Sequence, residues 1–102
     1  MIEIRRTDDY DDWFRKLRDR QARARILIRI NRLALGNPGD VRPVGGGVSE
    51  LRIDYGPGWR VYVRFVDGET AVLLTGGDKS TQQRDIERAR ALARALAKGA
   101  DR

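Results

Sequence analysis

The 102-residue sequence contains no cysteine and no histidine. The first absence excludes disulfides and thiolate chemistry, and the second excludes imidazole as a metal ligand or proton carrier. A metal site would need carboxylates alone, and we expect neither a metal nor a cofactor. No apolar stretch approaches the roughly 20 residues that span a bilayer. Because the amino terminus also lacks the apolar run of a secretion signal, we expect a cytoplasmic protein that does not enter a membrane.

The charges that are present are unevenly distributed. Lys and Arg outnumber Asp and Glu by 21 to 15, which gives a formal net charge of +6. Residues 20–64 hold 9 basic and 3 acidic side chains and so carry the excess, whereas residues 1–19 and 65–102 nearly balance. A basic region in one part of a small domain is typical of proteins that bind nucleic acid or an acidic protein. A soluble surface rich in arginine would have the same composition.

At this length the chain is expected to form one domain, residues 1–102, with room for a single modest core. Ile2 and Ile4 alternate with charged residues and predict a short strand at a sheet edge. Thr7 or Asp8 can then cap a helix whose apolar side chains recur at helical spacing, ending near residue 19. The aromatic stripe of this helix indicates a surface that faces the core.

A second amphipathic helix is predicted at about residues 21–35, followed by the glycine and proline typical of a helix end. Arg25, Arg29 and Arg32 recur at i, i+4 and i+7 and form a basic ridge on this helix. The ridge is a candidate RNA-binding surface, although a charged stripe is also the ordinary solvated face of a helix. Residues 40–47 end in three glycines and are expected to form a loop.

Residues 49–79 predict three antiparallel strands joined by two glycine-containing turns, at 56–58 and 67–68. Each turn sets a register, because directly opposed residues point to the same side of a sheet. A three-residue first loop places Arg52 opposite Tyr62. With a two-residue second turn, one face of this meander becomes an apolar core wall and the other face stays exposed.

The exposed face would carry the candidate functional residues of the two leading strands, namely Arg52, Arg60, Tyr62 and Arg64, with Leu73 partly covering its middle. The same register pairs Arg60 with Thr75 near the end of the third strand, so that Lys79 can approach Arg60 and Arg52. Three cations around one sheet end suit phosphodiester cleavage, because the phosphate must be oriented and its developing charge neutralised. Arginine serves this purpose well, since its planar guanidinium can grip two oxygens.

Proton transfer requires a further group, because a ribose 2′-hydroxyl that attacks its own phosphate must lose its proton. Without imidazole the base would be a carboxylate such as Asp78 or Asp54, a lysine of lowered pKa, or a group outside this protein. Cross-strand pairing of the arginines with Asp54 and Glu50 is the ordinary structural alternative. Residues 76–80, G-G-D-K-S, lack the spacing of a nucleotide-binding P-loop, which excludes that kind of site.

A last amphipathic helix is predicted after the meander, capped by Ser80 or Thr81 and closed by Gly99. The predicted fold class is therefore α+β. Its elements in order are an amino-terminal strand that joins the sheet, two helices, the antiparallel three-stranded meander and the carboxyl-terminal helix.

This order of elements, together with three motifs, resembles the RelE/ParE superfamily of type II toxins. The motifs are G-V-S-E-L-R-I at residues 47–53, G-W-R-V-Y at 58–62 and L-L-T-G-G-D-K-S at 73–80. Within the superfamily the chain is most similar to the HigB-like branch of addiction-module killer proteins. The likeness covers nearly the whole chain.

The resemblance implies a RelE-like fold and a ribosome-dependent endoribonuclease that cuts messenger RNA in the decoding site. A cognate antitoxin would hold it inactive, most simply as an oligomer of the two proteins. The basic residues of the family fall on Arg52, Arg60 and Lys79, and Tyr62 or Arg64 would stack on bases or contact the RNA backbone.

Where some ribonuclease relatives place a tyrosine or histidine, this chain reads Gln82-Gln83-Arg84-Asp85. The general acid and base therefore stay unassigned. Two alternatives remain open at this point: a non-enzymatic inhibitor of DNA gyrase with the same fold, and a plain RNA-binding module without toxicity.

Overall fold

The computed structural model describes the fold of residues 1–100 and the side chains of residues 1–97. The elements in order are β1 (Glu3–Arg6), α1 (Asp8–Lys16), α2 (Arg20–Ala34), β2 (Val41–Gly45), β3 (Val48–Arg52), β4 (Arg60–Phe65), β5 (Thr70–Gly77), the 3₁₀ turn η1 (Lys79–Thr81) and α3 (Gln82–Ala100). The fold is α+β, as predicted, with one mixed five-stranded sheet in the order β1-β5-β4-β3-β2.

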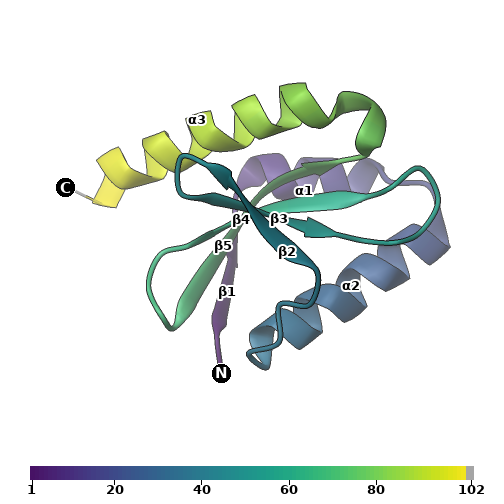
Figure 1. Ribbon diagram of the computed structural model, residues 1–102, viewed down its shortest axis with the longest axis horizontal. Helices are drawn as coiled ribbons and strands as arrows, with labels where there is room; N and C mark the ends of the chain where they lie inside the picture. The colour runs from purple at the N-terminus through teal and green to yellow at the C-terminus, as the bar shows by residue number, and fades with distance from the viewer. Residues whose placement is uncertain (101–102) are drawn as a thin grey trace.

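The sheet lies between two helical layers, with α3 along one face and α1 and α2 on the other (Figure 1). The core on the α1 and α2 side is built from Tyr10, Leu17, Ile26, Leu33, Leu51, Ile53, Val61, Val63, Ala71 and Leu73. A second core lies under α3 and consists of Val48, Tyr62, Val72, Leu74, Ala89 and Ala93. No helix in the described part of the chain is long and apolar enough to cross a membrane.

The first two helices follow from local sequence. The Thr7 side chain accepts a hydrogen bond from the Tyr10 amide at 3.0 Å and caps α1, as predicted. Asp19 caps α2 by accepting from the amides of Gln21 and Ala22 at 2.9 and 3.2 Å. Helix α1 ends at Lys16, earlier than expected, because Leu17 takes up an extended conformation as its C-cap.

The prediction of a loop at residues 40–47 is wrong for most of its length. Residues 41–45 form β2, which pairs antiparallel with β3. The three glycines at 45–47 all have positive φ angles, of 89°, 64° and 76°, and make the tight turn between these strands. The glycines therefore reverse the chain and leave the preceding residues free to pair.

The amino-terminal strand joins a sheet edge, as predicted, and it does so by parallel pairing of β1 with β5. At the other end of β5, the cap residue differs from the prediction. Asp78, rather than Ser80 or Thr81, caps the turn before α3 by accepting from the Ser80 amide at 2.8 Å. The helix continues through Gly99, which was expected to close it.

The register between β3 and β4 differs from the predicted one by two residues. Arg52 lies opposite Arg60 and Glu50 lies opposite Tyr62. The loop is longer than three residues, because the Ile53 amide donates to the Trp59 carbonyl at 2.9 Å and leaves residues 54–58 outside the ladder. A shift of two residues keeps each side chain on its predicted face.

The register between β4 and β5 differs from the predicted one by one residue beside the turn and by two residues beyond an irregularity between Tyr62 and Val63. The predicted pairing of Arg60 with Thr75 is therefore wrong, since Arg60 lies opposite Gly77. The Val66 amide donates to the Thr70 carbonyl at 3.0 Å and closes a three-residue turn, so that Val63 pairs with Leu73. A one-residue shift moves side chains to the other face of a sheet. Leu73 therefore joins the core on the α1 and α2 side, whereas Val72 packs under α3.

The face of the meander that was predicted to be exposed is covered by α3. Tyr62 is fully buried there, and Glu50 and Arg60 are 1% and 7% exposed. The physical reason is the changed register, since β5 now presents apolar side chains to this face and α3 packs against them through Ala89 and Ala93. The end of this face beside the β3–β4 loop remains open.

Candidate functional site

A pocket of about 300 Å³ opens at that end of the sheet. Its lining consists of Asp40, Arg52, Ile53, Asp54, Gly58, Trp59, Arg60 and Lys79. All three cations selected from the sequence thus line one pocket. They reach it from β3, from β4 and from the turn after β5.

Two features bring the cations together. Arg52 and Arg60 are directly opposed in the ladder and so project from the same face. Lys79 is held near them because its amide donates to the carbonyl of Pro57 in the β3–β4 loop at 3.3 Å. Gly58 permits this close approach, since a Cβ at that position would lie 3.1 Å from Arg60 Nη1 and 3.4 Å from Lys79 Cβ.

Arg60 is the most tightly held of the three cations. Its side chain is 8% exposed, its Nη1 donates to the Gly58 carbonyl at 2.7 Å, and its Nε lies 3.4 Å from Glu50 Oε2. The same Glu50 oxygen accepts hydrogen bonds from the Tyr62 hydroxyl at 3.2 Å and from Gln82 Nε2 at 3.0 Å. The guanidinium is thereby fixed at the pocket wall by neighbours on two sides.

Arg52 is more accessible, with its side chain 35% exposed. Its Nε lies 3.9 Å from Asp40 Oδ2, a long ion pair that solvent weakens. Lys79 is exposed. A ligand can therefore approach one rigid guanidinium and two cations that still contact solvent.

The two predicted proton acceptors differ in their availability. Asp54 lines the pocket. Asp78 does not, and its Oδ1 accepts from both the amide and the hydroxyl of Ser80 at 2.8 and 2.5 Å, so its role is to cap the turn. A third carboxylate, Asp40, also lines the pocket and was missed because no motif marks it.

Two of the predicted RNA contacts do not lie in this pocket. Tyr62 cannot stack on a base, because it is fully buried under α3. Burial, followed by the charge and hydrogen bond of Glu50, raises the pKa of its hydroxyl. Arg64 lies four residues along β4 from Arg60, roughly 13 Å away in a strand, and its guanidinium is against Gly47 in the β2–β3 turn.

The predicted basic ridge of α2 does not form one surface. Arg29 turns inward, where its Nη2 donates to the carbonyls of Pro38 and Asp40 at 2.8 and 3.2 Å and its Nη1 donates to the Arg52 carbonyl. Burial lowers the pKa of Arg29. Arg25 lies over the Tyr55 ring at 4.6 Å, and only Arg32 is exposed without such a contact among the described residues. Arg29 is therefore a structural residue, which holds the backbone of two pocket residues, Asp40 and Arg52.

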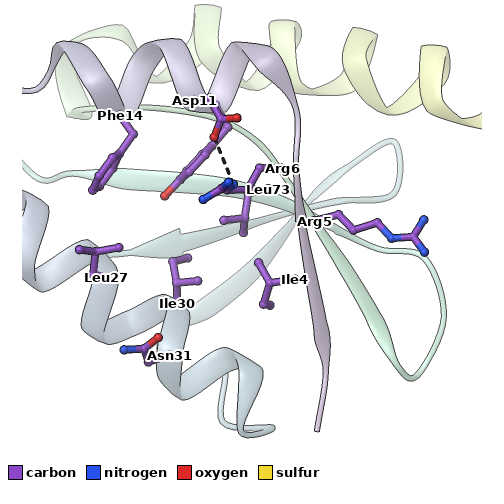
Figure 2. A pocket seen from close by; sticks show the side chains of 10 residues that line it. Ile4, Arg5, Arg6, Asp11, Phe14, Leu27, Ile30, Asn31 and Leu73 are labelled. Atoms are coloured by element: carbon purple, nitrogen blue, oxygen red, sulfur yellow. Dashed lines mark ion pairs between the residues drawn. The ribbon is translucent and has the colours of Figure 1, made fainter.

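A larger groove of about 800 Å³ lies on the opposite side of the sheet, between β1, α1 and α2 (Figure 2). Its walls are about equally polar and apolar, with Ile4, Phe14 and Ile30 among the apolar residues. The charged side chains at its rim are paired, as in the ion pair of 3.2 Å between Arg6 and Asp11. This groove lacks the grouped cations that a phosphodiester requires.

The described residues contain no group of three or more acidic side chains arranged to hold a metal ion. The chemistry available in the smaller pocket is that of fixed positive charge beside carboxylates. Such an arrangement can orient a phosphodiester, stabilise negative charge on its oxygens and accept a proton.

Comparison with known proteins assigns the chain to a family. Residues 12–98 match the family described as phage-derived protein Gp49-like (DUF891). The chain belongs to the Gp49-like family. This Gp49-like protein is also 48% identical, over 95 residues, to an uncharacterized protein of Haemophilus influenzae, with 93% of this chain and 96% of the relative covered. The family match spans all the residues that line the smaller pocket.

Proposed function

We propose that this Gp49-like protein is the toxin of a type II toxin–antitoxin system and cleaves messenger RNA on the ribosome. The observation that carries the proposal is that Arg52, Arg60 and Lys79 line one pocket. The resemblance of its motifs to HigB-like members of the RelE/ParE superfamily, and of its element order to the RelE-like fold, supports the same function. Its site of action is then the cytoplasm, where ribosomes translate.

In the proposed reaction, the scissile phosphate lies against Arg60, whose guanidinium is already fixed. Arg52 and Lys79 close on its nonbridging oxygens from the exposed side and neutralise the charge that develops as the ribose 2′-hydroxyl attacks. Asp54 and Asp40 line the pocket and are the carboxylates that can take the proton from that hydroxyl. As the 2′-oxygen bonds to phosphorus, the bond from phosphorus to the 5′-oxygen breaks. The products are a 2′,3′-cyclic phosphate and a 5′-hydroxyl, which receives its proton from the protonated carboxylate or from water. Asp78 does not line the pocket, and its Oδ1 accepts two hydrogen bonds from Ser80, which favours Asp54 and Asp40 for this role.

We further propose that a cognate antitoxin, encoded beside this protein, forms an oligomer with it and neutralises it. The resemblance supports this partner, and the net charge of +6 suits an acidic one. Co-expression of the neighbouring reading frame should restore growth to cells that express this protein. A neighbour that neither binds the protein nor restores growth would contradict this part of the proposal.

The decisive experiment compares two double variants in a translation extract and in cells. Arg52→Ala with Lys79→Ala should lower the rate of messenger cleavage on the order of a hundredfold or more while the protein stays folded, because both side chains contact solvent. The matched control, Lys16→Ala with Arg94→Ala, removes the same charges from exposed positions outside the pocket and should cleave normally. Equal activity of the two double variants would reject the site.

Gyrase inhibition is the second candidate, and one observation favours it. The pocket contains no phenol or imidazole, because Tyr62 is buried and histidine is absent. Mapping of transcript ends distinguishes the two functions. New ends near ribosome-bound codons support cleavage, whereas intact messages with a DNA-damage response would replace our proposal with gyrase inhibition.

A further inference from the structure

Glu50 is a charged residue in an apolar layer. It lies in β3, is 1% exposed, and shares the α3 side of the sheet with Val48 and Tyr62. A buried carboxylate is costly unless it is paired and hydrogen-bonded, and an apolar residue of similar size would pack there at lower cost. Core packing therefore does not explain why this position holds a glutamate.

The contacts of Glu50 all converge on one atom. Oε2 accepts from the Tyr62 hydroxyl at 3.2 Å and from Gln82 Nε2 at 3.0 Å, and it lies 3.4 Å from Arg60 Nε. Two of these three neighbours connect Glu50 to the pocket. Arg60 forms its wall, and Gln82 begins the helix that follows the turn carrying Lys79.

The position of Arg60 depends on this carboxylate. Arg60 lies directly opposite Arg52, and like charges in that relation repel each other. The negative charge of Glu50 offsets the repulsion, while the Gly58 carbonyl holds Nη1 at 2.7 Å. The Arg60 Nε is buried and makes no hydrogen bond within the described residues, so its contact with Glu50 at 3.4 Å is an ion pair.

We propose that Glu50 is a positioning residue, which holds the Arg60 guanidinium and the start of α3 so that the pocket is preorganised for a phosphodiester. This inference rests on the proposed ribonuclease function. Glu50 itself is too buried to touch the substrate and acts through Arg60. A preformed electrostatic site lowers the barrier because no reorganisation is required during the reaction.

The test uses Glu50→Gln, which keeps the shape of the side chain and removes its charge. We expect the cleavage rate at saturating ribosomes to fall about ten- to a hundredfold. This is the usual loss when a residue that orients a functional side chain is replaced, as measured for the partners of metal ligands. The KM should stay within about threefold, because the substrate contacts themselves remain. Glu50→Asp, which retains the charge, should recover part of the rate.

Tyr62→Phe is the matched control. It removes one donor from the same carboxylate oxygen but leaves the contact between Glu50 and Arg60. Its melting temperature should fall while its cleavage rate stays within about threefold of wild type. If Glu50 only stabilises the fold, Tyr62→Phe and Glu50→Gln will lower the rate in proportion to their losses of stability, and the proposal is overturned.

A double-mutant cycle provides the second measurement. If Glu50 acts through Arg60, the rate losses of Glu50→Gln and Arg60→Lys will not add in the double variant. Additive losses would contradict a positioning role. If Glu50→Gln lacks a melting transition, Glu50→Asp replaces it in the cycle, and additive losses of Glu50→Asp and Arg60→Lys overturn the inference.

The same assays separate this inference from the function on which it depends. A wild-type protein that cleaves messages and loses that activity in Arg52→Ala with Lys79→Ala, yet keeps it in Glu50→Gln, contradicts the inference alone. A wild-type protein that cuts no message contradicts both.

Discussion

Arg52 and Arg60 are directly opposed residues on neighbouring antiparallel strands. Their like charges are balanced on two sides, by Asp40 beside Arg52 and by Glu50 beside Arg60. The two pairs differ in environment, since Arg52 contacts solvent and Arg60 is buried. This difference means that the two arginines should respond differently to substitution.

Arg60→Ala should destabilise the protein by about 3–5 kcal/mol, because it leaves the Glu50 carboxylate buried without its cation. Arg52→Ala should change the free energy of unfolding by about 1 kcal/mol or less, since its pair is long and partly exposed. Urea denaturation of both variants measures the difference. Equal losses of stability would show that the buried pair has no special role in the fold.

Arg29→Ala should be destabilising by about 2–3 kcal/mol, because one charged side chain donates to the carbonyls of Pro38, Asp40 and Arg52. Two of those carbonyls belong to residues that line the smaller pocket, so the rate of cleavage should fall as well. Arg32→Ala, one helical turn away and exposed, should stay within about 0.5 kcal/mol of wild type. Both quantities can be measured on the same purified proteins, and an Arg29→Ala variant as stable as Arg32→Ala would contradict the prediction.

Gly76→Ala should cost about 1–3 kcal/mol of stability. A Cβ at this position would overlap the Trp13 ring, which packs against β5 from α1. Gly68→Ala provides the control, because no atom lies within 4 Å of its added Cβ. Thermal melting curves of the two variants should differ clearly, and a Gly76→Ala melting temperature equal to wild type would indicate that Trp13 can move aside.

The free energy of unfolding should fall as the pH rises from 10 to 12. Burial raises the pKa of Tyr10 to about 12 from its ordinary value of 10.0, with a smaller opposing effect from Arg6. In this interval the unfolded chain loses the Tyr10 proton while the folded chain keeps it, so ionisation favours unfolding by about 1.4 kcal/mol per pH unit. Tyr62, whose pKa is also raised, adds to the same trend.

Tyr10→Phe isolates this contribution. The variant should show a shallower loss of stability above pH 10 than wild type, because it has no phenol to ionise at that position. Below pH 9 the two curves should be parallel. Parallel curves up to pH 12 would mean that Tyr10 ionises equally in the folded and unfolded chains.

Local patterns in the sequence predicted the helical elements well. The apolar spacing that gives α1 and α2, and the Thr7 cap, depend on residues within a few positions of each other. The same patterns failed at residues 41–45, where three following glycines suggested a loop. Strand pairing there depends on β3, which lies later in the chain.

The candidate site was predictable in part. Arg52, Arg60 and Lys79 were chosen from the sequence and line one pocket. Asp40 was missed, since no motif marks it, and Glu50 was considered only as a surface partner. Tyr62 lies on the face predicted for it, but α3 covers that face, which no pattern within the meander indicates.

The sequence by itself determined the α+β class, the helix starts, the lack of thiol and imidazole chemistry, and the set of cations available to act together. Each of these depends on residue type or on spacing within one element. Only the tertiary structure decided which face α3 covers, that Arg60 and Glu50 are buried as a pair, and that Arg29 turns inward. Those outcomes depend on contacts between elements that are far apart in the sequence. Strand register is one such contact, because one added turn residue exchanges the two faces of a strand without changing any local pattern.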